Sequence, residues 1–70
     1  MRVSNKRVKA AKRDIWKALY AGAGMVQKSA DELREETGWD EGIIREALGE
    51  LLNEGWISFI DGKYEQLLVY

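Results

Sequence analysis

The sequence predicts one α+β domain over residues 1–70, with three helices, a short strand after the first helix and a C-terminal two-stranded hairpin. Three observations lead to this fold class. Apolar residues recur every three or four positions in three segments, which is the period of an amphipathic helix. Capping residues and glycines separate those segments. Near the end, an Asp-Gly pair divides two short segments rich in β-branched and aromatic residues, which indicates a hairpin.

The first helix is expected over residues 5–21. Its apolar stripe consists of Val8, Ala11, Ile15, Ala18 and Leu19. The Gly22-Ala23-Gly24 segment is expected to end this helix, because glycine readily adopts the left-handed conformation found at helix C-termini. Met25-Val26-Gln27 follows and is predicted to form the short strand.

Capping signals mark the second and third helices. Ser29 and Glu32 have the spacing of a capping box, and Gly38 is expected to end the second helix after about two turns, with Ala30, Leu33 and Thr37 on its inner face. Asp40 is expected to cap the third helix, where Trp39 and Ile44 have the spacing of a hydrophobic staple. Gly55 is expected to end it. Its predicted buried residues are Ile44, Ala47, Leu48, Leu51 and Leu52.

The last element is predicted to be a hairpin with a two-residue type I′ turn at Asp61-Gly62, because such a turn needs two positive φ angles. Its strands are WISFI and KYEQL. Pairing of Ile60 with Lys63 would place Ile57, Phe59 and Tyr64 on one face. We expect that face to be the apolar one.

This order of elements resembles the winged helix-turn-helix superfamily over nearly the whole chain. The segment SADELREETGWDEGIIREALGELLNEGWI is similar to the second helix, turn, third helix and start of the wing in small bacterial and archaeal regulators, with Gly55 and Ile57 leading into the wing. A second resemblance is to a small stand-alone prokaryotic winged-helix family of uncharacterised role, and it rests on Ala47-Leu48-Gly49, Leu51, Glu54-Gly55, Ile57 and Phe59. The resemblance implies a DNA-binding or a protein-assembly function, since winged helices serve both.

Charge divides the chain into two parts. Residues 1–17 hold seven basic residues against Asp14, and residues 18–70 hold four basic against eleven acidic residues. On an ideal helix the basic residues Arg2, Lys6, Lys9, Arg13 and Lys17 fall opposite the apolar stripe. We call these five the basic ridge. The ridge is either a solvated face or a contact surface for phosphate, an acidic protein or an anionic membrane, the last being disfavoured because the core needs the apolar stripe.

The third helix stands where a winged-helix protein places its DNA-reading helix. On its outward face Arg45 could read guanine and Asn53 could read adenine. Lys28 and Lys63 complete the expected basic groups of this docking surface. However, residues 40–54 carry a net charge of −4, which opposes phosphate binding. The sequence therefore predicts that the basic ridge supplies much of the phosphate contact.

A second hypothesis uses the same helix as a protein-binding surface. Glu46, Glu50 and Glu54 recur every four residues and could bind a basic partner, including the basic ridge of another copy in a homodimer or filament. Gly42 and Gly49 lie near the centre of the outward face. An interior helical glycine costs about 1 kcal/mol relative to alanine, so Gly49 is expected either to pack closely inside the chain or to let another backbone approach.

We expect a cytoplasmic, non-enzymatic protein. The chain has no cysteine and no histidine, and the sequence shows no phosphate-cradling glycine loop or converging carboxylates, so no cofactor and no metal are expected. The N-terminal residues are charged and polar, and no apolar run is long enough to predict a membrane span. The leading hypothesis is a small DNA-binding transcriptional regulator that binds double-stranded DNA as a homodimer. The alternative is a protein-interaction or assembly module.

Overall fold

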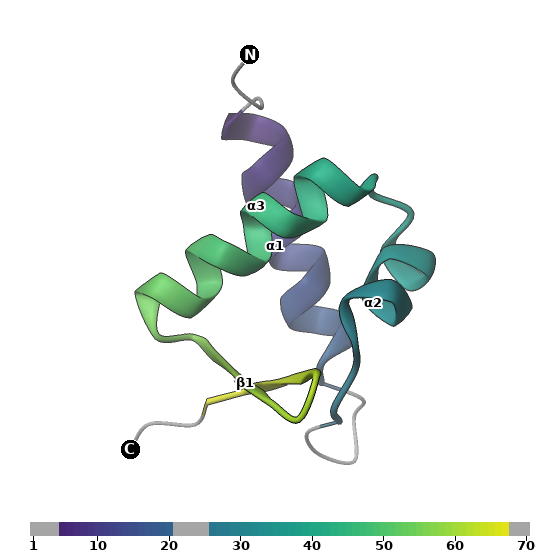
Figure 1. Cartoon of the computed structure of the whole chain (residues 1–70). Helices are drawn as coiled ribbons and strands as arrows, with labels where there is room; N and C mark the ends of the chain where they lie inside the picture. Colours follow the sequence, from purple (N-terminus) through teal and green to yellow (C-terminus); the bar gives the residue numbers. More distant parts are fainter. Residues whose placement is uncertain (1–4, 21–25, 68–70) are drawn as a thin grey trace.

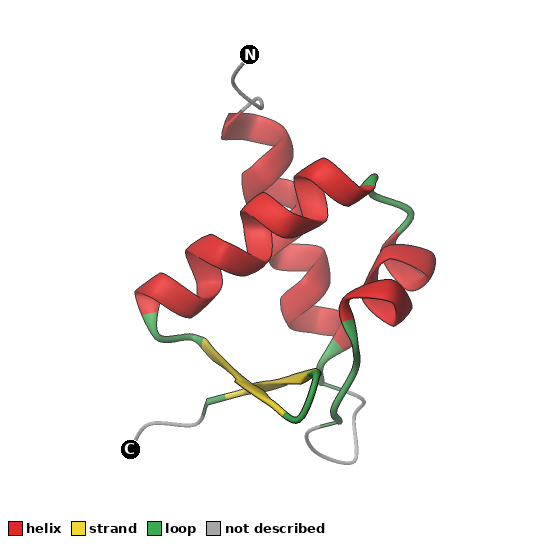
Figure 2. Cartoon of the chain, viewed as in Figure 1, coloured by secondary structure: helices red, strands yellow, loops and turns green. Residues whose placement is uncertain are grey.

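Three helices precede a hairpin in the computed structural model, which describes residues 5–20 and 26–67. The elements are α1 (Asn5–Ala18), α2 (Ala30–Thr37), α3 (Glu41–Glu54), β1 (Ile57–Ile60) and β2 (Lys63–Gln66). In Figure 1, α3 crosses in front of α1, α2 lies to one side, and the hairpin lies below. This arrangement, coloured by element in Figure 2, is consistent with a winged-helix-like topology.

The hydrophobic core lies where α1, α2 and α3 meet. From α1 it takes Val8, Ala11 and Ile15, with Leu19 just beyond the helix end, which confirms most of the predicted stripe. Its remaining buried apolar members are Leu33, Ile43, Ile44, Ala47, Leu48, Leu51 and Ile57. Within the described ranges, no helix is both long and apolar enough to cross a membrane.

The predicted helix caps are confirmed. The Ser29 side chain accepts from the Glu32 N–H and the Glu32 side chain accepts from the Ser29 N–H, so the capping box is complete. Gly38 ends α2 with φ +80°. The Asp40 side chain accepts from the Ile43 N–H at 2.9 Å, and Gly55 ends α3 with φ +82°. These local signals therefore set the limits of α2 and α3.

Two details of the helices differ from the prediction. α1 ends at Ala18 and not at residue 21, while the Gly22-Ala23-Gly24 segment lies outside the described residues. In α3, Leu52 was predicted to be buried but is 38% exposed, and Ile43 is buried in its place. The buried face of α3 is rotated toward α1, because α1 packs on the side of the helix that carries Ile43 and Ala47.

The hairpin has the predicted turn and register. Asp61 and Gly62 have φ angles of +53° and +80°, and Ile60 pairs with Lys63. The predicted apolar face is only partly correct. Ile57 is buried, but Phe59 on the same face is 53% exposed and packs against Tyr64 with ring centroids 4.7 Å apart.

The short strand predicted at Met25-Val26-Gln27 does not form at Val26 or Gln27, and Met25 lies outside the described residues. A single antiparallel bridge at Lys28 takes its place. The Lys28 N–H donates to the Tyr64 carbonyl at 3.1 Å, and the Tyr64 N–H donates to the Lys28 carbonyl at 2.7 Å. The pairing does not extend past Lys28 toward α2, because the next residue, Ser29, is already the N-cap of that helix.

Candidate functional site

The described part of the basic ridge is exposed along α1. Lys6, Lys9, Arg13 and Lys17 all face solvent, and none of them forms an ion pair within the described residues. Arg2 lies outside those residues. At 1.5 Å per residue, Lys6 to Lys17 spans roughly 16 Å, or about five base pairs of DNA. The described part of the ridge is thus a row of four exposed cations, of which Lys17 shares a hollow with Asp14 and Glu36.

The ridge and the outward face of α3 point in different directions. Val8, Ala11 and Ile15 pack into the core against α3, and the ridge lies on the other side of α1. Figure 1 shows α1 behind α3. Arg45 and Asn53 are exposed on the side of α3 that faces away from the core. The structure therefore does not bring the ridge together with Arg45 and Asn53 on one surface.

Intrachain ion pairs occupy most cations on the α3 side. Lys28 binds Glu36, and Arg45 binds Glu41 at 3.1 Å. Arg34 approaches the other oxygen of Glu41 at 3.5 Å. Asn53 and Lys63 are exposed, and within the described ranges Lys63 forms no ion pair. Few positive charges therefore remain available to phosphates on this side.

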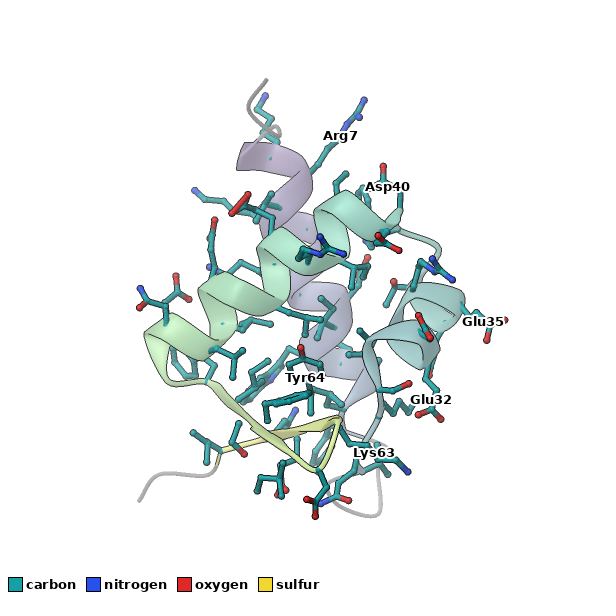
Figure 3. The ribbon with its side chains drawn as sticks, viewed as in Figure 1. Arg7, Glu32, Glu35, Asp40, Lys63 and Tyr64 are labelled. Atoms are coloured by element: carbon teal, nitrogen blue, oxygen red, sulfur yellow. The ribbon has the colours of Figure 1, made fainter. Side chains whose placement is uncertain are left out.

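Lys63 lies at the tip of the hairpin, on the side of α2, where Figure 3 shows it near Glu32. The pKa of Glu32 is lowered, chiefly by the hydrogen bond from the Ser29 backbone, with a smaller contribution from the charge of Lys63. Lys63 thus interacts with the acidic first turn of α2, so it is less available to bind a phosphate.

The predicted glutamate series has a partner within the chain. Lys12 Nζ lies 3.2 Å from Glu50 and 2.8 Å from Glu54. The sequence reasoning missed this contact. Lys12 follows Val8 by four residues and precedes Ile15 by three, so it borders the buried stripe, and that spacing could have indicated a contact with a neighbouring helix. In the described residues Glu46 forms no ion pair, so it is the member of the series left for a partner.

Replacing Lys12 with glutamine is expected to lower the free energy of unfolding by about 0.5–1 kcal/mol at neutral pH. Hydrogen bonds to Glu54 and then Glu50 raise the pKa of Lys12 above 10.5, against the opposing effect of burial. The stabilisation should be complete below pH 10.5 and lost as the pH rises through the raised pKa. Urea denaturation across pH would measure this. A difference between wild type and variant that persists in strong alkali would contradict it, and Lys17→Gln is the matched control.

A surface groove of about 370 Å³ runs between α2 and α3. Its apolar lining consists of Ala30, Ile44, Leu48, Leu52 and Tyr64, with Gly49 among them. A Cβ at Gly49 would meet no atom within 4 Å, and one at Gly42 would meet only an Asp40 oxygen at 3.5 Å. Close packing inside the chain therefore does not explain either glycine.

A second hollow, also missed by the sequence reasoning, adjoins the basic ridge. It measures about 350 Å³ and lies between α1, the end of α3 and the start of the hairpin. Trp16 and Trp56 line it, and their ring centroids are 5.8 Å apart at an interplanar angle of 79°. We call it the tryptophan hollow. The sequence contains one indication of this hollow: Trp16 follows Arg13 of the ridge by three residues, so the two side chains are neighbours on the surface of the helix.

Comparisons of the chain with protein-family models, with curated proteins and with solved structures found no match.

Proposed function

We propose that this chain is a small winged-helix-like DNA-binding protein that grips duplex DNA through the basic ridge on α1. The observation that supports this proposal is the row of four exposed cations that form no ion pair among residues 5–20 and 26–67. Each cation that neutralises a phosphate releases a condensed counterion, which drives association. The resemblance to winged helix-turn-helix regulators extends the proposal to transcriptional regulation. A homodimer would present two ridges to one duplex.

The proposed mode departs from groove reading by the third helix. α3 is acidic, it faces away from the ridge, and its Arg45 is engaged by Glu41. Contacts from lysine and arginine to phosphates position a protein on DNA but do not read bases. We therefore propose binding with little sequence preference, in which α3 contributes to the core and not to recognition.

Titration of a fluorescently labelled duplex, followed by anisotropy at several salt concentrations, tests the proposal. Four phosphate contacts should give a log–log slope of affinity against salt of about −3.6, so that affinity falls roughly a hundredfold between ~50 and ~200 mM salt. Two duplexes of different sequence should behave alike. Failure to bind either duplex even at the lowest salt would remove the DNA-binding proposal.

A second candidate function, protein interaction or assembly, is favoured by Gly49. This interior helical glycine is exposed beside the apolar α2–α3 groove, and no contact within the described chain requires it. Close approach of another backbone at Gly49 would explain why the helix has a glycine there although glycine destabilises it. Lys12 already engages Glu50 and Glu54. An assembly surface on α3 would therefore be centred on Gly42, Glu46 and Gly49.

Gly49→Ala tests the assembly function. Alanine has room here, so the variant should raise the free energy of unfolding by about 1 kcal/mol through helix propensity alone. If another copy packs against Gly49, the same methyl should weaken self-association in sedimentation experiments. Greater stability with unchanged sedimentation would count against assembly through this face. Glu35→Ala, at an exposed position of α2 that does not line the groove, provides the control.

A further inference from the structure

The tryptophan hollow combines aromatic and cationic groups. Trp56 is 53% exposed although tryptophan has the largest apolar side chain available for burial. Lys12 and Arg13 from α1 line the same hollow, together with Glu54. A large indole surface therefore remains open to solvent directly beside cations.

The hollow is held in place by the hairpin. Gln66 is buried, and its side-chain amide donates to the Trp16 carbonyl at 2.8 Å. This bond joins the last turn of α1 to β2, whose partner strand β1 follows directly after Trp56. The edge-to-face contact of Trp16 and Trp56 is therefore part of the fold of the chain itself.

The tryptophan hollow is continuous with the basic ridge. Arg13 belongs to both, and Trp16 lies one turn further along the same side of α1. The one carboxylate at the hollow, Glu54, is bound by Lys12 at 2.8 Å. Lys12 also binds Glu50 at 3.2 Å, so these three residues keep a net charge of −1 and Arg13 is the cation of the hollow that remains for a phosphate. The Trp16–Trp56 pair and the ridge together form one surface.

Duplex DNA cannot use the aromatic part of this surface, since its bases are stacked inside the helix. Single-stranded nucleic acids have accessible base faces, and proteins bind them by combining a cationic track for the backbone with aromatic side chains for the bases. The ridge supplies the cations, and Trp16 and Trp56 supply the aromatic groups in a hollow that Arg13 of the ridge also lines, so this surface meets both requirements.

We propose that the tryptophan hollow stacks an unpaired base of single-stranded DNA whose phosphates lie along the basic ridge. This inference rests on the proposed function, because it takes the ridge as the phosphate-contacting surface. Trp56 supplies the exposed stacking face, Trp16 fixes its orientation from the side, and Arg13 contacts the adjoining phosphate. The protein should then bind a single strand more tightly than a duplex at the same salt concentration.

Tryptophan fluorescence provides a direct test, with an oligothymidylate of about twelve nucleotides, which falls within the site sizes of single-strand-binding folds. Binding should quench the fluorescence, while an abasic strand of equal length should bind more weakly and quench little. Trp56→Ala should weaken binding of the oligothymidylate roughly tenfold, and Trp56→Tyr, which keeps an aromatic face, should restore most of that loss. An oligouridylate that binds more tightly than the oligothymidylate would overturn the assignment to DNA.

Phe59→Ala is the matched control, because Phe59 is also 53% exposed but lies on the hairpin beside Tyr64. It should leave both affinity and quenching unchanged, and circular dichroism would verify the fold of each variant. Duplex binding with the expected salt dependence, but with no single-strand preference and no effect of Trp56→Ala, overturns the stacking site alone. Absence of binding to either form of DNA overturns the stacking site and the proposed function together.

Discussion

A variant with Lys6, Lys9, Arg13 and Lys17 all replaced by glutamate is expected to lose duplex DNA binding at every salt concentration at which the wild type binds. The four reversals replace the entire described ridge with negative charge. The sign of the interaction with phosphate then changes from attraction to repulsion. A graded series should show the same effect in steps, because each single change to glutamine should reduce the salt slope by about 0.9. Anisotropy titration measures both.

A control for the glutamine series changes Lys28, Arg45 and Lys63 to glutamine on the other side of the molecule. Two of these residues are already paired with glutamates, so we expect duplex affinity within a few-fold of wild type. The opposite pattern, in which the control variant loses binding and the ridge variant keeps it, would place the DNA on α3. All seven positions are at the surface or in exposed ion pairs, so the thermal unfolding of both variants should stay cooperative.

Replacing Leu33 with alanine is expected to have the largest effect on stability. Leu33 is the only fully buried residue of α2, so its side chain anchors this two-turn helix to the core. Leucine-to-alanine changes at buried sites cost about 2–5 kcal/mol, and a domain of this size holds only ~3–5 kcal/mol in total. We therefore expect a largely unfolded chain at 25 °C, measured by urea denaturation followed by circular dichroism.

Leu52→Ala makes the same chemical change at a position that is 38% exposed. It should cost less than about 1 kcal/mol, because little apolar area returns to water. Equal losses for Leu33→Ala and Leu52→Ala would contradict the burial of Leu33. Amide exchange measured along α2 would further show whether that helix loosens before the rest of the chain.

The elements predicted correctly from the sequence are those that neighbouring residues determine. Ser29 with Glu32, Asp40 and the Asp61-Gly62 turn each act over a few positions, so their spacing was sufficient. The exposure of Leu52 and the burial of Ile43 depend on where α1 packs against α3. The bridge at Lys28 depends on Tyr64, which lies on the far side of two helices in the sequence. Sequence patterns within one segment could not predict these contacts between distant segments.

The same distinction applies to the candidate sites. The exposure of the basic ridge could be predicted from helical spacing within α1 alone. The partners of Lys12 are 38 and 42 residues away, and Trp56 meets Trp16 only through the fold, so both contacts were missed. Lys28 and Arg45 were expected to be available to a partner. Glu36 and Glu41 lie close to them in the sequence. Helical spacing joins Arg45 to Glu41, but Lys28 lies before α2, so spacing alone could not show its ion pair with Glu36.

The hydrogen bonds that β2 makes to distant segments have a consequence for how the chain folds. Tyr64 is joined to the segment before α2, and Gln66 to a carbonyl 50 residues earlier in α1. Contacts between such distant positions require closure of long loops, which slows folding. The contacts of Lys12 that join α1 to α3 span 38 and 42 residues, so core formation and hairpin docking have similar loop-closure costs. The two aromatic rings beside the ridge should therefore become aligned in the same cooperative step that forms the core.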